Sequence, residues 1–209
     1  MGEAFSPKHR KAISTTLSSK IKYNISFAKD TNSVVFSIDY TVAPKNKYPE
    51  LFLENIKAYE KIVSNFETLF SFKIKKLVLL GDSGGAHLCL SIMKNAISKG
   101  LRLPDNLFIL YPSKYNVNTL DSRILFDTMT PSLLMSCRDP FIEHTIMDHI
   151  QKSVLDLDTN NIEFYENDDN LNFYLTDTNI VKKFPQTHII VASDDPLKDE
   201  SFKLADFLL

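Results

Sequence analysis

The sequence predicts an α/β fold built on a parallel sheet, and three observations support this prediction. Short apolar runs of four or five residues recur along the chain, separated by segments with helical periodicity. These runs are continuously apolar and do not alternate with polar residues, which is typical of parallel strands buried on both faces. One run ends in a glycine-rich turn that opens a further apolar helix. Strands that alternate with helices favour a parallel sheet with flanking helices.

Four strands are predicted in chain order. They cover residues 34–38, 77–80, 107–111 and 188–192. Pro112 closes the third strand, because proline has no N–H to donate to a neighbouring strand. The loop after the first strand contains Pro44, which disfavours helical backbone at Ala43.

Helices are predicted between and after these strands. From Pro49 onward, apolar side chains recur at three- and four-residue steps as far as Phe66. The helix after the glycine-rich turn is apolar from Ala86 to Ile97, and Gly100 favours its end. Apolar spacing near the C-terminus indicates a final helix around residues 202–208.

Composition narrows the class of protein. A chain of 209 residues fits one domain, and 44% hydrophobic residues with 15 Phe allow a sizeable core. A net charge of −2 argues against nucleic acid as the main partner. Cys89 and Cys137 do not make a disulfide framework, and Cys89 is expected to be a buried thiol. With no signal peptide and no apolar run of roughly 20 residues, a cytoplasmic protein is expected.

The glycine-rich turn carries the strongest chemical signal. It reads Gly81, Asp82, Ser83, Gly84, Gly85. Gly-x-Ser-x-Gly between a strand and a helix is typical of a nucleophile elbow, in which the serine hydroxyl is exposed on a strained turn with φ > 0. Side chains at Gly81 or Gly85 would collide across the turn, and the Gly84 N–H could bind an oxyanion. The alternative is a glycine-rich turn that only lets strand and helix pack closely.

A long stretch between the third and fourth strands is acidic. Residues 154–180, the acidic segment, contain no Lys or Arg and seven carboxylates: Asp156, Asp158, Glu163, Glu166, Asp168, Asp169 and Asp177. Like charges repel, so an irregular, solvated insert is expected. A calcium loop is the alternative, but neither the Asp-x-Asp-x-Asp-Gly spacing nor a glycine turn supports it.

With these residues in view, the chain resembles the hormone-sensitive lipase family of α/β-hydrolases from about Tyr23 to Leu209. The block from Ser37 to Pro44 is similar to that family's strand end with its Leu-Ala-Pro turn. The elbow is similar to Gly-Asp-Ser-Ala-Gly, with Gly84 in place of Ala. Residues 110–112, 138–141, 185–192 and 195–199 also fit. The blocks around Pro104, residues 138–140 and 187–188 favour the eukaryotic branch over bacterial esterases.

The resemblance implies a carboxylic ester hydrolase with no metal or organic cofactor. Ser83 would be the nucleophile, the Gly84 N–H part of the oxyanion hole, and Asp195 the triad acid that orients an imidazole. Asp195 could instead be a turn residue before Pro196, a role that Asp194 could fill equally well. The implied substrates are small apolar esters, lipid esters or acylglycerols. Peripheral contact with a lipid droplet or membrane surface is also implied, and contact with nucleic acid is not.

Two parts of the family's machinery are not found in the sequence. The triad histidine follows the acid in this family, but no histidine follows His188. The family's His-Gly-Gly-Gly loop should lie near residues 8–11, which read Lys-His-Arg-Lys. Its preceding strand has no room in residues 1–7. We therefore expect a basic, Ser/Lys-rich end at 1–22 and a partial hydrolase domain at 23–209, truncated at both ends, whose sheet lacks a central strand and the last strand.

None of the remaining histidines is expected to act as the base. His188 is expected at a strand end away from the elbow, and His87 is expected to be a packing or hydrogen-bonding residue. His9 lies in the basic end. His144 and Asp148 have i, i+4 spacing that could ligate a metal, but His149 is turned off that face, so no metal site is predicted.

Three functions remain open at this point. The first is a lipase or esterase whose chain, taken alone, is inactive or weak. The second is a non-catalytic binding protein on the same scaffold, like the plant gibberellin receptors, which resemble this family and bind a small apolar acid. The third is an inactive fragment. Asp195 is expected to face Ser83 across a gap the size of an imidazole, and Asp199 is its competitor.

Overall fold

In a computed structural model of the chain, the described residues form one parallel sheet of five strands. The structure describes residues 11–15, 21–70, 73–113, 130–135, 144–155 and 162–209. The strands are β1 (Lys11–Thr15), β2 (Val34–Ser37), β3 (Lys76–Asp82), β4 (Asn106–Leu110) and β5 (Gln186–Ile190). Their order across the sheet is β2-β1-β3-β4-β5, and every neighbouring pair is parallel. The carboxyl ends of all described strands therefore share one edge.

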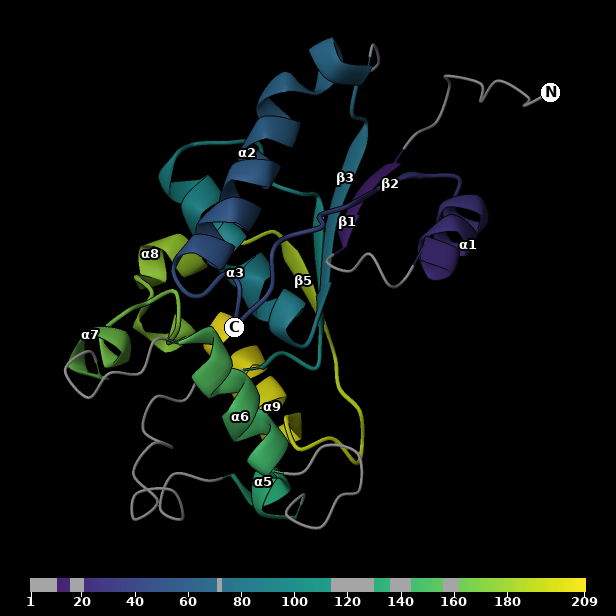
Figure 1. The fold of residues 1–209 in the computed structure, drawn as a ribbon. Coiled ribbons are helices and arrows are strands. Elements are labelled where there is room, and N and C mark those ends of the chain that lie inside the picture. Colours follow the sequence, from purple (N-terminus) through teal and green to yellow (C-terminus); the bar gives the residue numbers. More distant parts are fainter. Residues whose placement is uncertain (1–10, 16–20, 71–72, 114–129, 136–143, 156–161) are drawn as a thin grey trace.

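Helices flank the sheet. They are α1 (Ile21–Thr31), α2 (Glu50–Phe70), α3 (Gly84–Ser98), α5 (Pro131–Met135), α6 (His144–Val154), α7 (Ile162–Glu166), α8 (Thr178–Val181) and α9 (Lys198–Leu208), with a 3-10 turn η4 at Phe173–Leu175. Figure 1 shows α1 on one face of the sheet and α2 and α3 on the other. The predicted parallel α/β architecture is confirmed, with strand boundaries that shift by one or two residues.

The expectation that the sheet lacks a central strand is wrong. β1 lies between β2 and β3, and Ala12 stands opposite Val34 on one side and Leu77 on the other. This strand comes from the segment assigned to a basic N-terminal end. Its sequence, Lys-Ala-Ile-Ser-Thr, has no apolar run. It was missed because its place depends on backbone pairing with two neighbours and not on a local apolar pattern.

The main core fills the layer between the sheet and α2, α3 and α9. Leu79, Leu107 and Ile109 from the strands are almost fully buried there, together with Met93 of α3 and Leu204 of α9. Eleven of the 15 residues of α3 are buried, including the Cys89 thiol predicted to be so. The elbow helix is therefore fixed in the interior, and so is the turn at its start.

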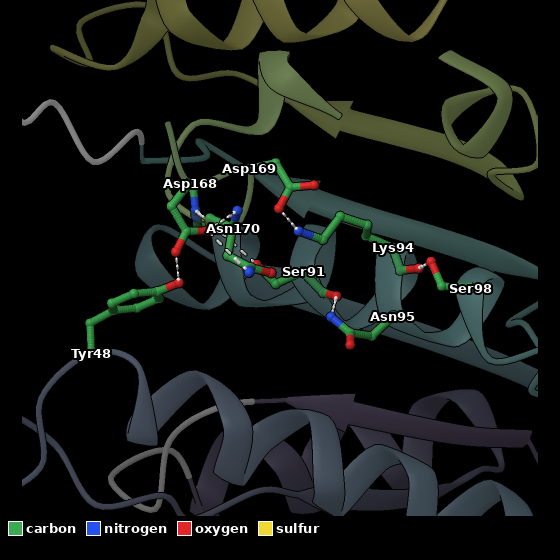
Figure 2. Close-up of polar contacts among 9 residues, drawn as sticks. Tyr48, Ser91, Lys94, Asn95, Ser98, Asp168, Asp169 and Asn170 are labelled. Carbon is green, nitrogen blue, oxygen red and sulfur yellow. Dashed lines mark hydrogen bonds and ion pairs between the residues drawn. The ribbon is translucent and has the colours of Figure 1, made fainter. Parts of the chain in front are cut away.

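The acidic segment is not the solvated insert that its composition predicts. Its described part forms α7, η4 and α8, and Leu171, Phe173 and Tyr165 are buried. Tyr48 donates a hydrogen bond to the Asp168 carboxylate, and Lys94 forms an ion pair with Asp169 (Figure 2). These partners lie far away in the sequence, so a count of charges within the segment could not reveal them.

Candidate active site at the strand-to-helix turn

Ser83 occupies a one-residue turn between a strand and a helix. β3 ends at Asp82 and α3 begins at Gly84, so Ser83 is the residue that joins them. Its backbone has φ 53° and ψ −122°, as the elbow interpretation predicted. A non-glycine residue rarely adopts positive φ, and such strain persists only where the surrounding structure enforces it. The Ser83 N–H donates to the Leu110 carbonyl at 2.9 Å, which ties the turn to β4.

The glycines of the turn differ in whether the structure has space for a side chain at their positions. A Cβ atom at Gly81 would stand 2.3 Å from the Gly85 carbonyl oxygen and 2.7 Å from the Cys89 sulfur. Any side chain at this position would therefore push the helix away from the strand. A Cβ at Gly84 would meet no atom within 4 Å. Gly81 is thus required by the close approach of β3 and α3, as predicted, whereas Gly84 has space for alanine.

The Ser83 hydroxyl and the N-terminus of α3 are both suited to nucleophilic catalysis. Ser83 is the N-cap residue of α3, yet its side chain makes no capping hydrogen bond. The Ser83 carbonyl accepts the N–H groups of Ala86 at 3.0 Å and His87 at 3.3 Å. The first N–H groups of a helix have no intrahelical acceptor and favour negative charge. The Gly84 N–H is therefore suited to bind an oxyanion beside the hydroxyl.

Two tyrosines that the sequence analysis did not assign to the site lie beside the elbow. Tyr111 donates a hydrogen bond to the Asp82 carboxylate at 3.4 Å, from a backbone with φ 35°. Burial, together with the negative charge of Asp82, raises the pKa of the Tyr40 hydroxyl. Both tyrosines follow the last residues of strands that neighbour β3 or β1. Their position at strand ends was the signal that could have found them.

Asp195 lies in the loop after β5, on the same edge of the sheet as Ser83. β4 separates β5 from β3, so the two loops are two strand positions apart. One carboxylate oxygen of Asp195 accepts the Leu197 N–H at 2.7 Å, a turn contact of the kind weighed as the alternative role. Asp199 instead accepts the Ser132 N–H at 2.8 Å and so supports α5, while Asp194 is exposed. The triad role of Asp195 stays a prediction.

Of the three histidines whose side chains the structure describes, two have contacts other than Ser83. His87 is buried, with both ring nitrogens against backbone carbonyl oxygens, as expected for a hydrogen-bonding residue. His188 lies in the middle of β5 and not at its end, and its ring stacks on Phe108 at 4.5 Å. His149 is exposed on α6.

Several candidate residues lie outside the described part of the chain. These are residues 8–10, which include His9, residues 138–141 of the family-like block, and Cys137. His144 and Asp148 lie on α6, but nothing is described of their side chains. Among the described residues, no group of three His, Cys, Asp or Glu side chains could hold a metal ion. No helix of this described part is long and apolar enough to cross a membrane.

Comparison with known proteins places these features in a family. Residues 13–209 match the alpha/beta hydrolase fold family. The chain is 31% identical to hormone-sensitive lipase of Mus musculus over 135 residues, which are 65% of this chain and 16% of the lipase. It is 25% identical to an esterase of Gibberella moniliformis over 175 residues, 83% of this chain and 50% of that protein. The chain thus spans half or less of the length of these relatives.

Solved structures share the fold. Carboxyl esterase 2 of the fungus Tuber melanosporum superposes with a TM-score of 0.78 at 18% identity, over 95% of this chain and 62% of that one. A hyperthermophilic esterase from the archaeon Pyrobaculum calidifontis gives 0.77 at 18% identity, over 95% and 63%. The family match and the shared fold, together with the resemblance to hormone-sensitive lipase, lead to one conclusion: this chain belongs to the alpha/beta hydrolase fold family.

Proposed function

We propose that this protein is a serine carboxylic ester hydrolase of the lipase and esterase type. The observation that carries the proposal is the positive φ of Ser83 on a one-residue turn between β3 and α3. Strain of this kind holds a hydroxyl clear of its own helix, where it can reach a substrate carbonyl. The names of the relatives, hormone-sensitive lipase and esterase, support ester substrates, of which lipid esters and acylglycerols are the finer proposal.

In the proposed reaction, the Ser83 hydroxyl oxygen attacks the ester carbonyl carbon, and a base takes its proton. The carbonyl oxygen becomes an oxyanion, which the Gly84 N–H at the start of α3 stabilises. Collapse of this intermediate breaks the bond to the alcohol, which leaves with the proton from the base. Water then hydrolyses the acyl-serine by the same steps. Asp195 would hold an imidazole base in the correct tautomer.

The rate of ester hydrolysis depends on a side chain that can accept the Ser83 proton. The sequence has five histidines, none of which follows His188. His87 is buried against two carbonyls and His188 is stacked within the sheet, so neither reaches over Ser83. General acid–base catalysis contributes a factor of roughly 10² to 10⁴, so we expect turnover barely above background.

Chemical rescue by free imidazole tests the proposal. Hydrolysis of p-nitrophenyl butyrate is measured with increasing imidazole for the wild-type chain and for Ser83→Ala, which removes the nucleophile and corrects for hydrolysis by imidazole itself. We expect a saturable, Ser83-dependent increase, because a bound imidazole would act as the base. Rates that stay equal for the two proteins at every imidazole concentration would contradict the proposal.

A matched pair of acid variants tests the role of Asp195. Asp195→Asn should weaken the rescue by imidazole, because an amide cannot stabilise imidazolium. Asp199→Asn, which alters the contact to Ser132, should leave the rescue in place. The opposite result would move the triad acid to Asp199. Tight binding of a small apolar acid with no rescue would favour the non-catalytic binding protein.

A further inference from the structure

His87 joins the elbow to two other parts of the molecule. It lies on α3, four residues after Ser83, and only 2% of it is exposed. Its ring Nδ1 is 3.0 Å from the carbonyl oxygen of Ser113, in the loop after β4. Its Nε2 is 2.5 Å from the carbonyl oxygen of Asn170, in the acidic segment. One buried side chain therefore bridges two loops that belong to different parts of the sequence.

The Ser113 side of this bridge leads directly to the nucleophile. The Ser113 N–H points to the Ser83 carbonyl at 3.4 Å, and the backbone N–H of His87 donates to the same carbonyl at 3.3 Å. The Ser83 N–H in turn donates to Leu110, three residues before Ser113. The loop after β4 and the elbow are thus joined by backbone hydrogen bonds.

The Asn170 side is anchored independently of the elbow. Within residues 168–170, here called the acidic turn, the Asn170 N–H donates to the Asp168 carboxylate at 2.8 Å. The turn is attached on one side through Asp168 to Tyr48 and on the other through Asp169 to Lys94 (Figure 2). Because both attachments use side chains of buried or partly buried residues, the Asn170 carbonyl is a fixed point.

The nitrogen that carries the proton decides which carbonyl the ring serves. A neutral imidazole has one N–H, and imidazolium has two. Burial lowers the pKa of His87, against the opposing effect of the two carbonyls, so the ring is neutral near pH 7. The Asn170 carbonyl also lies 3.4 Å from the Ser91 hydroxyl, which can donate to it. A proton on Nδ1 serves the Ser113 carbonyl and leaves the Asn170 carbonyl to the Ser91 hydroxyl, whereas a proton on Nε2 serves the nearer Asn170 carbonyl and leaves Ser113 without a donor from the ring.

The charged groups around the ring come from three elements. Lys94 of α3 lowers the pKa of His87, and its own partner Asp169 lies in the acidic turn, next to Asp168. Glu200 of α9 lines the same small cavity as His87, and Tyr174 donates a hydrogen bond to it. The carboxylates of Asp168, Asp169 and Glu200 thus each have a hydrogen-bonding partner other than the ring.

We propose that His87 is a positioning residue for the nucleophile. With its proton on Nδ1, it fixes the loop at residues 111–113, and with it the backbone of Ser83, against the anchored acidic turn. The proposal rests on the proposed function, because its consequence is the orientation of the Ser83 hydroxyl. It assigns His87 no contact with substrate and no part in proton transfer to it.

The experiment measures amide hydrogen exchange by NMR on the full chain in three variants. His87→Phe keeps an aromatic ring against Phe52 but removes the N–H, and His87→Gln restores a donor. Tyr48→Phe is the matched control, because it loosens the acidic turn without touching Ser113. We expect His87→Phe to speed exchange at the Ser83 and Ser113 amides about tenfold, since a lost hydrogen bond of about 1.4 kcal/mol gives that factor.

The other two variants should separate positioning from general stability. His87→Gln should return the Ser83 and Ser113 amides toward wild-type protection, and Tyr48→Phe should speed exchange only in the acidic turn. A ring ¹⁵N spectrum of the wild-type chain should show the proton on Nδ1. A proton on Nε2 alone, or equal acceleration at Ser83 in His87→Phe and Tyr48→Phe, would overturn the proposal. None of these readouts needs turnover, so a chain without esterase activity would contradict only the proposed function.

Discussion

The elbow and the acidic segment pack against the same helix, α3, but they are specified in different ways. At the elbow, one glycine permits an approach that any Cβ would block at 2.3 Å, and every residue involved lies within ten positions. In the acidic segment, Asp168 meets a tyrosine 120 residues away and Asp169 meets a lysine 75 residues away. Steric demands within a turn can be predicted from a short motif, whereas a charged turn depends on partners that composition does not reveal.

The largest loss of stability is expected when the local packing of the elbow is disturbed. Gly81→Ala places a Cβ against the Gly85 carbonyl and the Cys89 sulfur, so strand and helix must separate. Because backbone cannot move aside as a side chain does, we expect a loss of at least ~3 kcal/mol, the upper end for overpacking. Urea denaturation measures it.

Gly84→Ala is the control for this prediction, because its Cβ meets nothing within 4 Å. It should be neutral or slightly stabilising, by up to ~1 kcal/mol, through the reduced freedom of the unfolded chain. Equal losses in the two variants would show that the glycines of the turn are not distinguished by close approach.

The next largest loss of stability is expected when the buried part of the acidic segment is disturbed. Leu171 in the acidic segment is fully buried, so Leu171→Ala should lower the free energy of unfolding by about 3 kcal/mol. Leu175, from the same segment, is 49% exposed, and Leu175→Ala should stay within about 0.5 kcal/mol of wild type. Thermal denaturation of the two variants side by side measures the difference. If Leu171→Ala were as stable as wild type, the segment would be the solvated insert that its composition predicts.

A smaller effect should separate an ion pair with one buried partner from a surface ion pair. The Lys94 side chain is 9% exposed, and Asp169→Asn leaves its ammonium without a counter-charge. Because Asp169 is 42% exposed, we expect a loss of about 1–2 kcal/mol and not the 3–5 kcal/mol of a fully buried pair. Glu60→Gln breaks the exposed pair with Lys99 and should cost less than ~1 kcal/mol. Similar losses in denaturant would contradict the burial of Lys94.

The smallest expected effect is a change in how stability depends on pH. Burial lowers the pKa of His87 in the folded chain below its unfolded value of about 6.5. The unfolded chain then binds the proton more readily, so this contribution to stability is complete above about pH 6.5 and is lost as the pH falls through the folded pKa. His87→Gln should remove that part of the pH dependence. Melting temperatures between about pH 8 and about pH 5 measure it, and parallel curves would show that His87 does not titrate differently on folding.

The sequence allowed four of the five described strands and the strained turn at Ser83 to be predicted. Four strands and the positive φ of Ser83 followed from apolar runs and from the glycine pattern, because both act over a few residues. β1 was missed because its pairing with β2 and β3 replaces an apolar signal. The buried acidic segment was missed because its counter-charge and its apolar contacts come from α3 and from the start of α2.

The most direct test of the account is to locate the reactive serine. The chain is incubated with a fluorophosphonate ester in the presence of imidazole, and the adduct is mapped by mass spectrometry in wild type and in Ser83→Ala. Because Ser83 has a strained backbone on the turn that opens α3, we predict one adduct, on Ser83, that disappears in the variant. An adduct spread over other serines, or none on Ser83, would contradict the assignment of this turn as a nucleophile elbow.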